Sequence, residues 1–128
     1  MIDESYNANP GSVAAALTAL GERPWKGRRV AILGDMFELG DLAPALHEGL
    51  AEAVKASGVG LLLTAGEAMK SLHDALWATP GLPIRNRPST DAWLGEVKAL
   101  LQPGDLVLIK GSRGMAMERI VKDLLDGS

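Results

Sequence analysis

Polar side chains are concentrated in three short stretches of the chain, and each stretch has the composition of a ligand-binding loop. The first, DESYNANP at residues 3–10, holds two acids, a tyrosine and two asparagines directly before an alanine-rich run. A carboxylate accepts from ribose hydroxyls, amides pair with base edges, and a phenol ring offers an apolar face, so these side chains suit a nucleoside. The candidate nucleotide-binding residues are Asp3, Glu4, Tyr6, Asn7 and Asn9.

Helix capping is the alternative interpretation of the same stretch. Asn9 can accept from the free N–H groups of a first helical turn, Pro10 suits a helix start, and either acid adds favourable charge there. Capping accounts for one or two polar residues, and it leaves the tyrosine, the first asparagine and one acid without a role. Both interpretations stay open at this point.

The second stretch, GDMFELGD at residues 34–41, follows the strongest hydrophobic run. Asp35 and Glu38 lie three positions apart, and the apolar residues between them can pin the loop so that the acids face a cleft. A carboxylate in that place can meet an ammonium group or orient a basic partner. A strand-to-helix turn with solvated acids explains the same residues, and the spacing alone does not decide between the two.

The third stretch, KGSRG at residues 110–114, combines Lys110, Ser112 and Arg113 with two glycines. Glycine permits close backbone approach, and a hydroxyl with two cations suits a carboxylate or phosphate, so an anion-binding turn is predicted. The spacing is not that of a Walker A loop, and no G-x-G-x-x-G follows any predicted strand. A helix start with incidental basic residues is the alternative.

Other candidates for chemistry are weaker. The chain has no cysteine and two histidines, so we expect no metal site held by this chain. His47 and His73 are interpreted as surface or satisfied packing residues, because neither has a neighbouring nucleophile. The tryptophans lie away from the three stretches and are interpreted as core or edge packing; they are Trp25, Trp77 and Trp93.

Alternating strand and helix patterns must position these stretches. Apolar runs at 28–34, 59–66 and 105–111 read as buried strands, with 83–86 and 1–5 as further candidates. Helical patterns lie between them, at Gly11 to Leu20, Ala43 to Ser57, Glu67 to Trp77, Thr90 to Leu101 and Met115 to Leu125. The predicted fold is α/β: an open, doubly wound, mostly parallel sheet with helices on both faces, which binds ligands beyond the carboxyl ends of its strands.

Length and charge limit the class of protein further. We expect the 128 residues, 1–128, to form a single domain. A net charge of −3 argues against nucleic-acid partners and against anionic membranes. No apolar run is long enough for membrane insertion and no export signal is visible, so the cytoplasm is the expected location. A strand this close to residue 1 suggests that something upstream is missing; Met1 and the final Gly127 and Ser128 are either native or added.

Three motifs in order resemble the C-terminal domain of the Mur ligases: DESYNANP, ILGDMFELG followed by His47, and LIKGSRGMAMERIV. They span almost the whole chain. The SYNANP and GDMFELG stretches resemble most the members that add D-Ala-D-Ala to UDP-N-acetylmuramoyl-tripeptide in bacterial peptidoglycan synthesis. The resemblance implies a Rossmann-like domain that closes over ATP and helps to bind the dipeptide.

The resemblance also implies roles for the three stretches. The first would meet the adenosine, with Asp3 or Glu4 on the ribose. Asp35 and Glu38 would lie near the incoming ammonium of D-Ala-D-Ala. The remaining candidates would face the dipeptide carboxylate or the phosphates; they are Lys110, Ser112 and Arg113.

The family's UDP-substrate domain and its central ATPase domain would both lie upstream of this chain. The central domain carries the P-loop and most Mg²⁺ ligands, so the isolated chain is expected to be inactive and to hold no bound cofactor. Two alternatives remain: a stand-alone Rossmann- or flavodoxin-like nucleotide-binding module without catalysis, and a related ligase that polyglutamates folate.

Overall fold

The structure, a computed structural model, describes residues 2–4, 9–37, 39–112 and 115–126, with residues 2–4 and 126 described by their backbone. Its strands are β1 (Ile2–Glu4), β2 (Arg29–Gly34), β3 (Leu61–Ala65), β4 (Ile84–Arg87) and β5 (Leu106–Lys110). Its helices are α1 (Pro10–Glu22), α2 (Ala43–Glu48), α3 (Ala51–Ser57), α4 (Lys70–Leu76), α5 (Val97–Leu100) and α6 (Glu118–Asp126), with short 3₁₀ turns η1 (Gly40–Leu42) and η2 (Asp91–Trp93). None of the helices in these ranges is both long and apolar enough to cross a bilayer.

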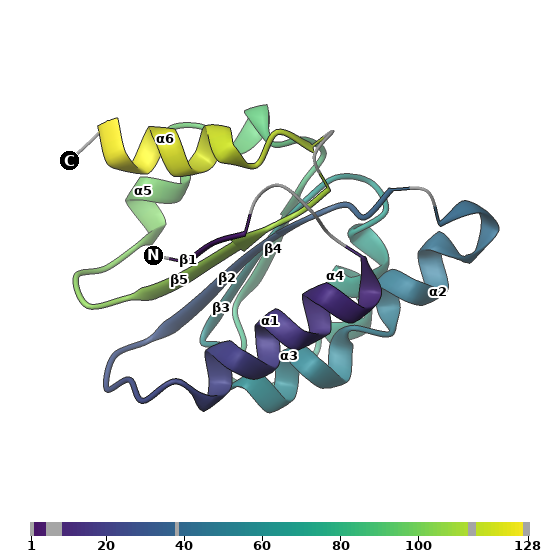
Figure 1. Ribbon diagram of the computed structural model, residues 1–128, viewed down its shortest axis with the longest axis horizontal. Coiled ribbons are helices and arrows are strands. Elements are labelled where there is room, and N and C mark those ends of the chain that lie inside the picture. Colours follow the sequence, from purple (N-terminus) through teal and green to yellow (C-terminus); the bar gives the residue numbers. More distant parts are fainter. Residues whose placement is uncertain (1, 5–8, 38, 113–114, 127–128) are drawn as a thin grey trace.

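The strands form one parallel sheet in the order β1-β5-β2-β3-β4. Helices α1, α3 and α4 cover one face, while α5 and α6 cover the other (Figure 1). The carboxyl ends of the strands meet at one edge, on the right in Figure 1. This open parallel sheet with helices on both faces confirms the predicted fold class.

The hydrophobic core has two halves, one on each face of the sheet. In β2, Ala31 and Leu33 pack with α1 and α3, whereas Val30 and Ile32 pack with Trp93 and α6. Successive side chains of a strand point to opposite faces, so a run that is apolar at every position can fill both halves. The continuous apolar runs in the sequence are therefore the central strands.

Two predicted helices are interrupted. The pattern at 43–57 forms two helices. Gly49 N–H still donates to Ala45, four residues back, but Leu50 N–H donates to His47, three residues back, and this tighter turn separates α2 from α3. The pattern at 90–101 breaks at Gly95, whose φ of +83° lies in the left-handed region that stops a right-handed helix. Hydrophobic spacing did not reveal either break, since the apolar residues keep their period across it.

An ion pair joins β2 to β5 at the opposite, amino edge of the sheet. Arg28 donates to Asp105 through Nε (3.0 Å) and through a terminal nitrogen (2.6 Å), and the Gln102 N–H donates to the same carboxylate at 2.7 Å. Burial raises the pKa of Asp105, but these hydrogen bonds and the guanidinium charge outweigh it and lower the pKa below its usual range. The ionised carboxylate is thus favoured by folding.

Acid should therefore weaken the fold through Asp105. A carboxyl group whose pKa is lowered by folding contributes stability above its unfolded value of 3.8, and loses that contribution as the pH falls through the lower folded value. Urea unfolding from pH 6 down to pH 3 should show a smaller acid loss in Asp105→Asn than in the wild type. Asp91→Asn is the control, since the Asp91 carboxylate pairs with Arg119 at an exposed position, where an ion pair contributes little to stability. Equal acid slopes for Asp105→Asn and the wild type would contradict this assignment.

Candidate functional site

The described parts of the three polar stretches meet at the carboxyl edge of the sheet. Glu4 at the end of β1 is in register with Lys110 at the end of β5, and Lys110 is in register with Leu33 near the end of β2. The order β1-β5-β2 therefore places the first, third and second stretches side by side. In an open α/β sheet this is the edge at which ligands bind.

Four hydrogen bonds to Asp35 hold the second stretch in place. The backbone N–H of Asp35 donates to Ala65 (3.1 Å), and its carbonyl accepts from Ser112 N–H (3.1 Å). Its carboxylate accepts from the N–H groups of Ala68 (3.2 Å) and Met69 (2.7 Å), just before α4 begins. These contacts make Asp35 a rigid part of the edge, with two carboxylate oxygens that each keep further acceptor capacity.

Ser112 links the third stretch to the second. Its hydroxyl accepts from Phe37 N–H at 2.9 Å, in addition to its own N–H donating to Asp35. Lys110 and Ser112 are both buried, at 6% and 8% exposure, although their side chains are polar. A cationic and a hydroxyl side chain therefore lie inside this edge of the sheet.

Asn9 caps α1, as the capping interpretation predicted. Its side chain accepts from Ser12 N–H at 2.9 Å, and the Ser12 hydroxyl accepts from Asn9 N–H at 3.0 Å. This reciprocal pair satisfies two backbone donors at the helix start. The described contacts of Asn9 are those of a cap.

Several predicted site residues have no described side chain. Asp3 and Glu4 are described by their backbone, which pairs with Ile109 and Lys110 in the sheet. The others lie outside the described residues; they are Tyr6, Asn7, Glu38 and Arg113.

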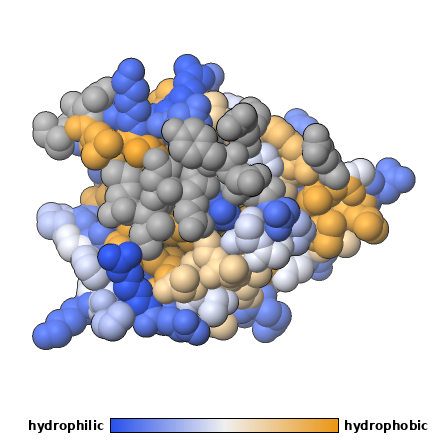
Figure 2. All heavy atoms as spheres, viewed as in Figure 1, coloured by the Kyte–Doolittle hydropathy of each residue, from blue (hydrophilic) through white to orange (hydrophobic). Residues whose placement is uncertain are grey.

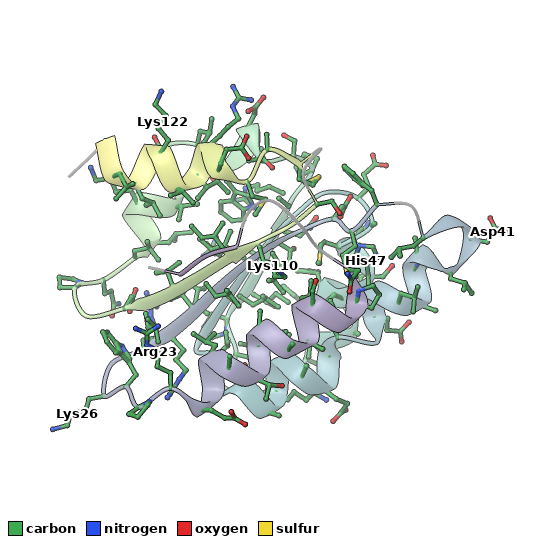
Figure 3. All side chains as sticks on the ribbon, in the orientation of Figure 1. Arg23, Lys26, Asp41, His47, Lys110 and Lys122 are labelled. Atoms are coloured by element: carbon green, nitrogen blue, oxygen red, sulfur yellow. The ribbon has the colours of Figure 1, made fainter. Side chains whose placement is uncertain are left out.

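His47 is fully buried and both ring nitrogens have partners. Nδ1 lies 2.6 Å from the Ala43 carbonyl oxygen, and Nε2 accepts from Met36 N–H at 3.0 Å. Figure 3 shows His47 on the inner side of α2, whereas Asp41 projects outward from the neighbouring tip. The interpretation of His47 as a satisfied packing residue is confirmed for the described contacts.

A cavity of about 400 Å³ opens at the ends of β2, β3 and β4. Asp35 and Phe37 line it from the second stretch, and Thr90 closes one wall by donating to the Met115 carbonyl at 2.5 Å. Among the described residues, no sequence motif indicated the cavity's other charged lining residues; they are Glu67, Asp91 and Arg119. Gly66, which also lines the cavity, ends the apolar run at 59–66 that predicted a strand.

Apolar groups are exposed beside this edge. Phe37 is 44% exposed and Leu42 is 63% exposed. In Figure 2 hydrophobic atoms gather at the right-hand end, where Figure 1 places α2. The carboxyl edge therefore combines buried polar groups with an apolar border.

The fold, an open parallel sheet covered by helices on both faces with polar loops at its carboxyl edge, is that of the Rossmann-like α/β domains. Within this class, residues 1–113 match the family model described as "Mur ligase, glutamate ligase domain". The chain belongs to the Mur ligase family.

Two sequence relatives carry the same name. The chain is 37% identical over 126 residues to the UDP-N-acetylmuramoyl-tripeptide--D-alanyl-D-alanine ligase of Escherichia coli, covering 97% of this chain and 26% of the relative. It is 32% identical to the Bacillus subtilis protein of the same name, covering 98% of this chain and 28% of the relative. The chain thus spans about a quarter of the length of these relatives.

Solved structures agree with the fold. A crystal structure of MurF from Acinetobacter baumannii superposes with a TM-score of 0.80 at 27% identity, covering 95% of this chain and 27% of that one. The MurF ligase of Thermotoga maritima in complex with ADP gives a TM-score of 0.74 at 21% identity, again over 95% of this chain and 27% of that one. The second likeness bears on the fold alone.

Proposed function

We propose that this chain is the C-terminal domain of an ATP-dependent, ADP-forming ligase that adds D-Ala-D-Ala to UDP-N-acetylmuramoyl-tripeptide. The single observation that carries the proposal is the match over nearly the whole chain to relatives of that name, at up to 37% identity. The arrangement of three polar stretches at one sheet edge supports it. The proposal makes residues 1–128 one domain and places the UDP-substrate and ATPase domains elsewhere in the ligase.

The proposed reaction has two steps. ATP transfers its γ-phosphoryl group to the terminal carboxylate of the tripeptide and leaves as ADP. The amine of D-Ala-D-Ala then attacks the acyl phosphate, a C–N bond forms, and inorganic phosphate leaves as the nitrogen gives up a proton. An acyl phosphate hydrolyses in water, so a domain that closes over the site protects the intermediate.

The first stretch is proposed to meet the adenosine of ATP. In this assignment Asp3 or Glu4 accepts from the ribose, while Tyr6, Asn7 and Asn9 surround the base and ribose. The position of the stretch supports it, because the stretch continues from the end of β1 beside β5 and leads into α1. The side-chain oxygen of Asn9 already accepts from Ser12 N–H in the cap of α1. Asn9 would therefore contact the ligand through its side-chain amide nitrogen.

The second and third stretches are proposed to bind the dipeptide. Asp35 and Glu38 attract the ammonium group, and Lys110, Ser112 and Arg113 attract the carboxylate or the phosphates. Two observations support this division. Asp35 lines the cavity of about 400 Å³, and Ser112, which lies outside the described lining, contacts the lining residues Asp35 and Phe37. A dipeptide fits within a volume of that size.

Mg²⁺ is assigned to the rest of the ligase. Within the described ranges no group of three or more His, Asp or Glu side chains is placed to hold a metal ion. The ion, when bound with ATP, would neutralise charge on the transferring phosphoryl group. This chain's part is to orient the amine and exclude water.

The test is ATP-dependent phosphate release by the complete ligase that contains this chain, with UDP-N-acetylmuramoyl-tripeptide present. Release should require D-Ala-D-Ala and should not occur with glutamate as the amine. Release that depends on glutamate and ignores D-Ala-D-Ala would assign the domain to another branch of the family. Copurification of a flavin or nicotinamide with the 128-residue chain would instead favour a stand-alone nucleotide-binding module.

A further inference from the structure

The loop after β2 is fixed by its backbone N–H groups, each of which has a different partner. Asp35 N–H donates to β3 through Ala65, and Phe37 N–H donates to Ser112 in the third stretch. Between them, Met36 N–H donates to Nε2 of His47 on α2, at 3.0 Å. His47 is the ionisable one of these three acceptors.

The two hydrogen bonds of the His47 ring, to Ala43 and to Met36, determine which ring nitrogen carries a hydrogen. The Ala43 carbonyl oxygen can only accept, so Nδ1, at 2.6 Å, must carry the hydrogen. Met36 N–H can only donate, so Nε2 must be without one. A neutral ring with hydrogen on Nδ1 satisfies both partners, and neither the other tautomer nor the protonated ring does so.

One peptide unit is thereby held at both ends. The carbonyl of Asp35 accepts from Ser112 N–H at 3.1 Å, and the N–H of the same peptide, on Met36, donates to His47. A peptide unit held at one end can rotate about its neighbouring bonds, whereas a unit held at both ends has a fixed plane. His47 therefore also fixes how the second stretch lies against Ser112.

We propose that His47 is a positioning residue for the amine substrate: its neutral ring clamps the Asp35–Met36 peptide and so sets the spacing between Asp35 and Ser112. The clamp itself depends only on the contacts above. Its link to the amine rests on the proposed function, which places the dipeptide between these two stretches.

Two substitutions separate the clamp from simple packing. The side chain of His47→Asn reaches the Nδ1 position, where it can still donate to Ala43, and leaves Met36 N–H without its acceptor. The side chain of His47→Gln is longer and brings an acceptor oxygen near the Nε2 position. His73→Asn is the matched control, since His73 lies on α4 and contacts Asp74 and Trp77.

The first measurement is hydrogen exchange at the Met36 amide in the 128-residue chain. Exchange in His47→Asn should be about tenfold faster than in the wild type, as expected for loss of one buried hydrogen bond. His47→Gln should recover most of the protection, and His73→Asn should match the wild type. Unchanged Met36 exchange in His47→Asn would overturn the clamp.

The second measurement is steady-state kinetics of the complete ligase. His47→Asn should raise the KM for D-Ala-D-Ala about tenfold and leave the KM for ATP near the wild-type value, while His47→Gln restores the dipeptide KM. If His47→Asn exchanges faster at Met36 but has an unchanged KM for D-Ala-D-Ala, the positioning role is wrong, although the hydrogen bond from Met36 to His47 is confirmed. A wild-type ligase that does not use D-Ala-D-Ala would overturn both the proposed function and the positioning role. In that case Met36 exchange would still test whether His47 clamps the Asp35–Met36 peptide.

A third measurement covers the case in which His47→Asn does not fold. The long-range ¹H–¹⁵N spectrum of the wild-type imidazoles should show His47 as a neutral ring with hydrogen on Nδ1. A His47 ring with hydrogen on Nε2 would leave no acceptor for Met36 N–H and would overturn the clamp.

Discussion

Gly66→Ala should lower the free energy of unfolding of the 128-residue chain by about 3 kcal/mol or more, because two effects add at this position. Gly66 has a φ of +112°, which L residues with a side chain rarely adopt. An added Cβ would also lie 2.2 Å from Cγ of Asp35. The Asp35 carboxylate has little room to move away, since Ala68 and Met69 hold both of its oxygens.

Gly81→Ala is the control for a positive φ without a steric contact. Gly81 also has a positive φ, of +76°, and an added Cβ there meets nothing within 4 Å. Its loss should therefore be about 1 kcal/mol, from the left-handed backbone alone. Urea unfolding of both variants measures the difference, and losses of equal size would show that the contact of Gly66 with Asp35 has no energetic weight.

Trp93→Ala should cost about 3–5 kcal/mol of folding free energy, the usual range for removing a fully buried large aromatic side chain. Trp93 is 0% exposed and fills the half of the core under α5 and α6. Its Nε1 donates to the Thr64 carbonyl at 2.8 Å, and the guanidinium carbon of Arg87 lies 4.7 Å from the ring centroid. Truncation therefore removes packing, a buried hydrogen bond and a cation–π contact together.

Trp77→Ala is the control for tryptophan content. Trp77 is 67% exposed and contacts the His73 ring at a centroid distance of 5.2 Å. Its removal should change the unfolding free energy by about 0.5 kcal/mol or less. Thermal and urea unfolding of both variants measure the two losses. A larger loss of unfolding free energy in Trp77→Ala than in Trp93→Ala would contradict the assignment of Trp93 to the core.

The strands were predictable because the sheet is covered on both faces. A strand buried on two sides must be apolar at every position, so residues 29–34, 61–65 and 106–110 stand out as continuous runs. The edge strand β4 was located to within one residue at each end, with turn residues on both sides. The helix ends were harder, since the tight turn at Leu50 and the positive φ of Gly95 are backbone features that hydrophobic spacing does not record.

The site was predictable as a set of stretches and less so as a set of contacts. Loops after parallel strands share an edge whatever their sequence, so the meeting of the second and third stretches follows from the order β5-β2. The contacts depend on residues far along the chain: the Asp35 carboxylate accepts from Ala68 and Met69, more than 30 residues away. No local pattern encodes such a pair.

Asn9 and His47 show that local contacts can be predicted from the sequence whereas contacts between packed elements cannot. Asn9 contacts Ser12, three residues ahead, so its role as a cap could be predicted from the sequence. The acceptor role of His47 toward Met36 depends on how α2 packs against the end of β2, which residue types do not reveal. Ligand assignments for the first stretch stay predictions, since most of its side chains lie outside the described residues.

The most direct test of the account is to locate where substrates bind this domain in the complete ligase. Hydrogen exchange would be compared with and without a non-hydrolysable ATP analogue, UDP-N-acetylmuramoyl-tripeptide and D-Ala-D-Ala. We expect new protection at residues 34–37 and 110–112, at the carboxyl edge, and none at residues 24–28 and 102–105, at the amino edge. Protection confined to the amino edge, or no protection anywhere in this domain, would contradict the claim that the carboxyl edge is the substrate face.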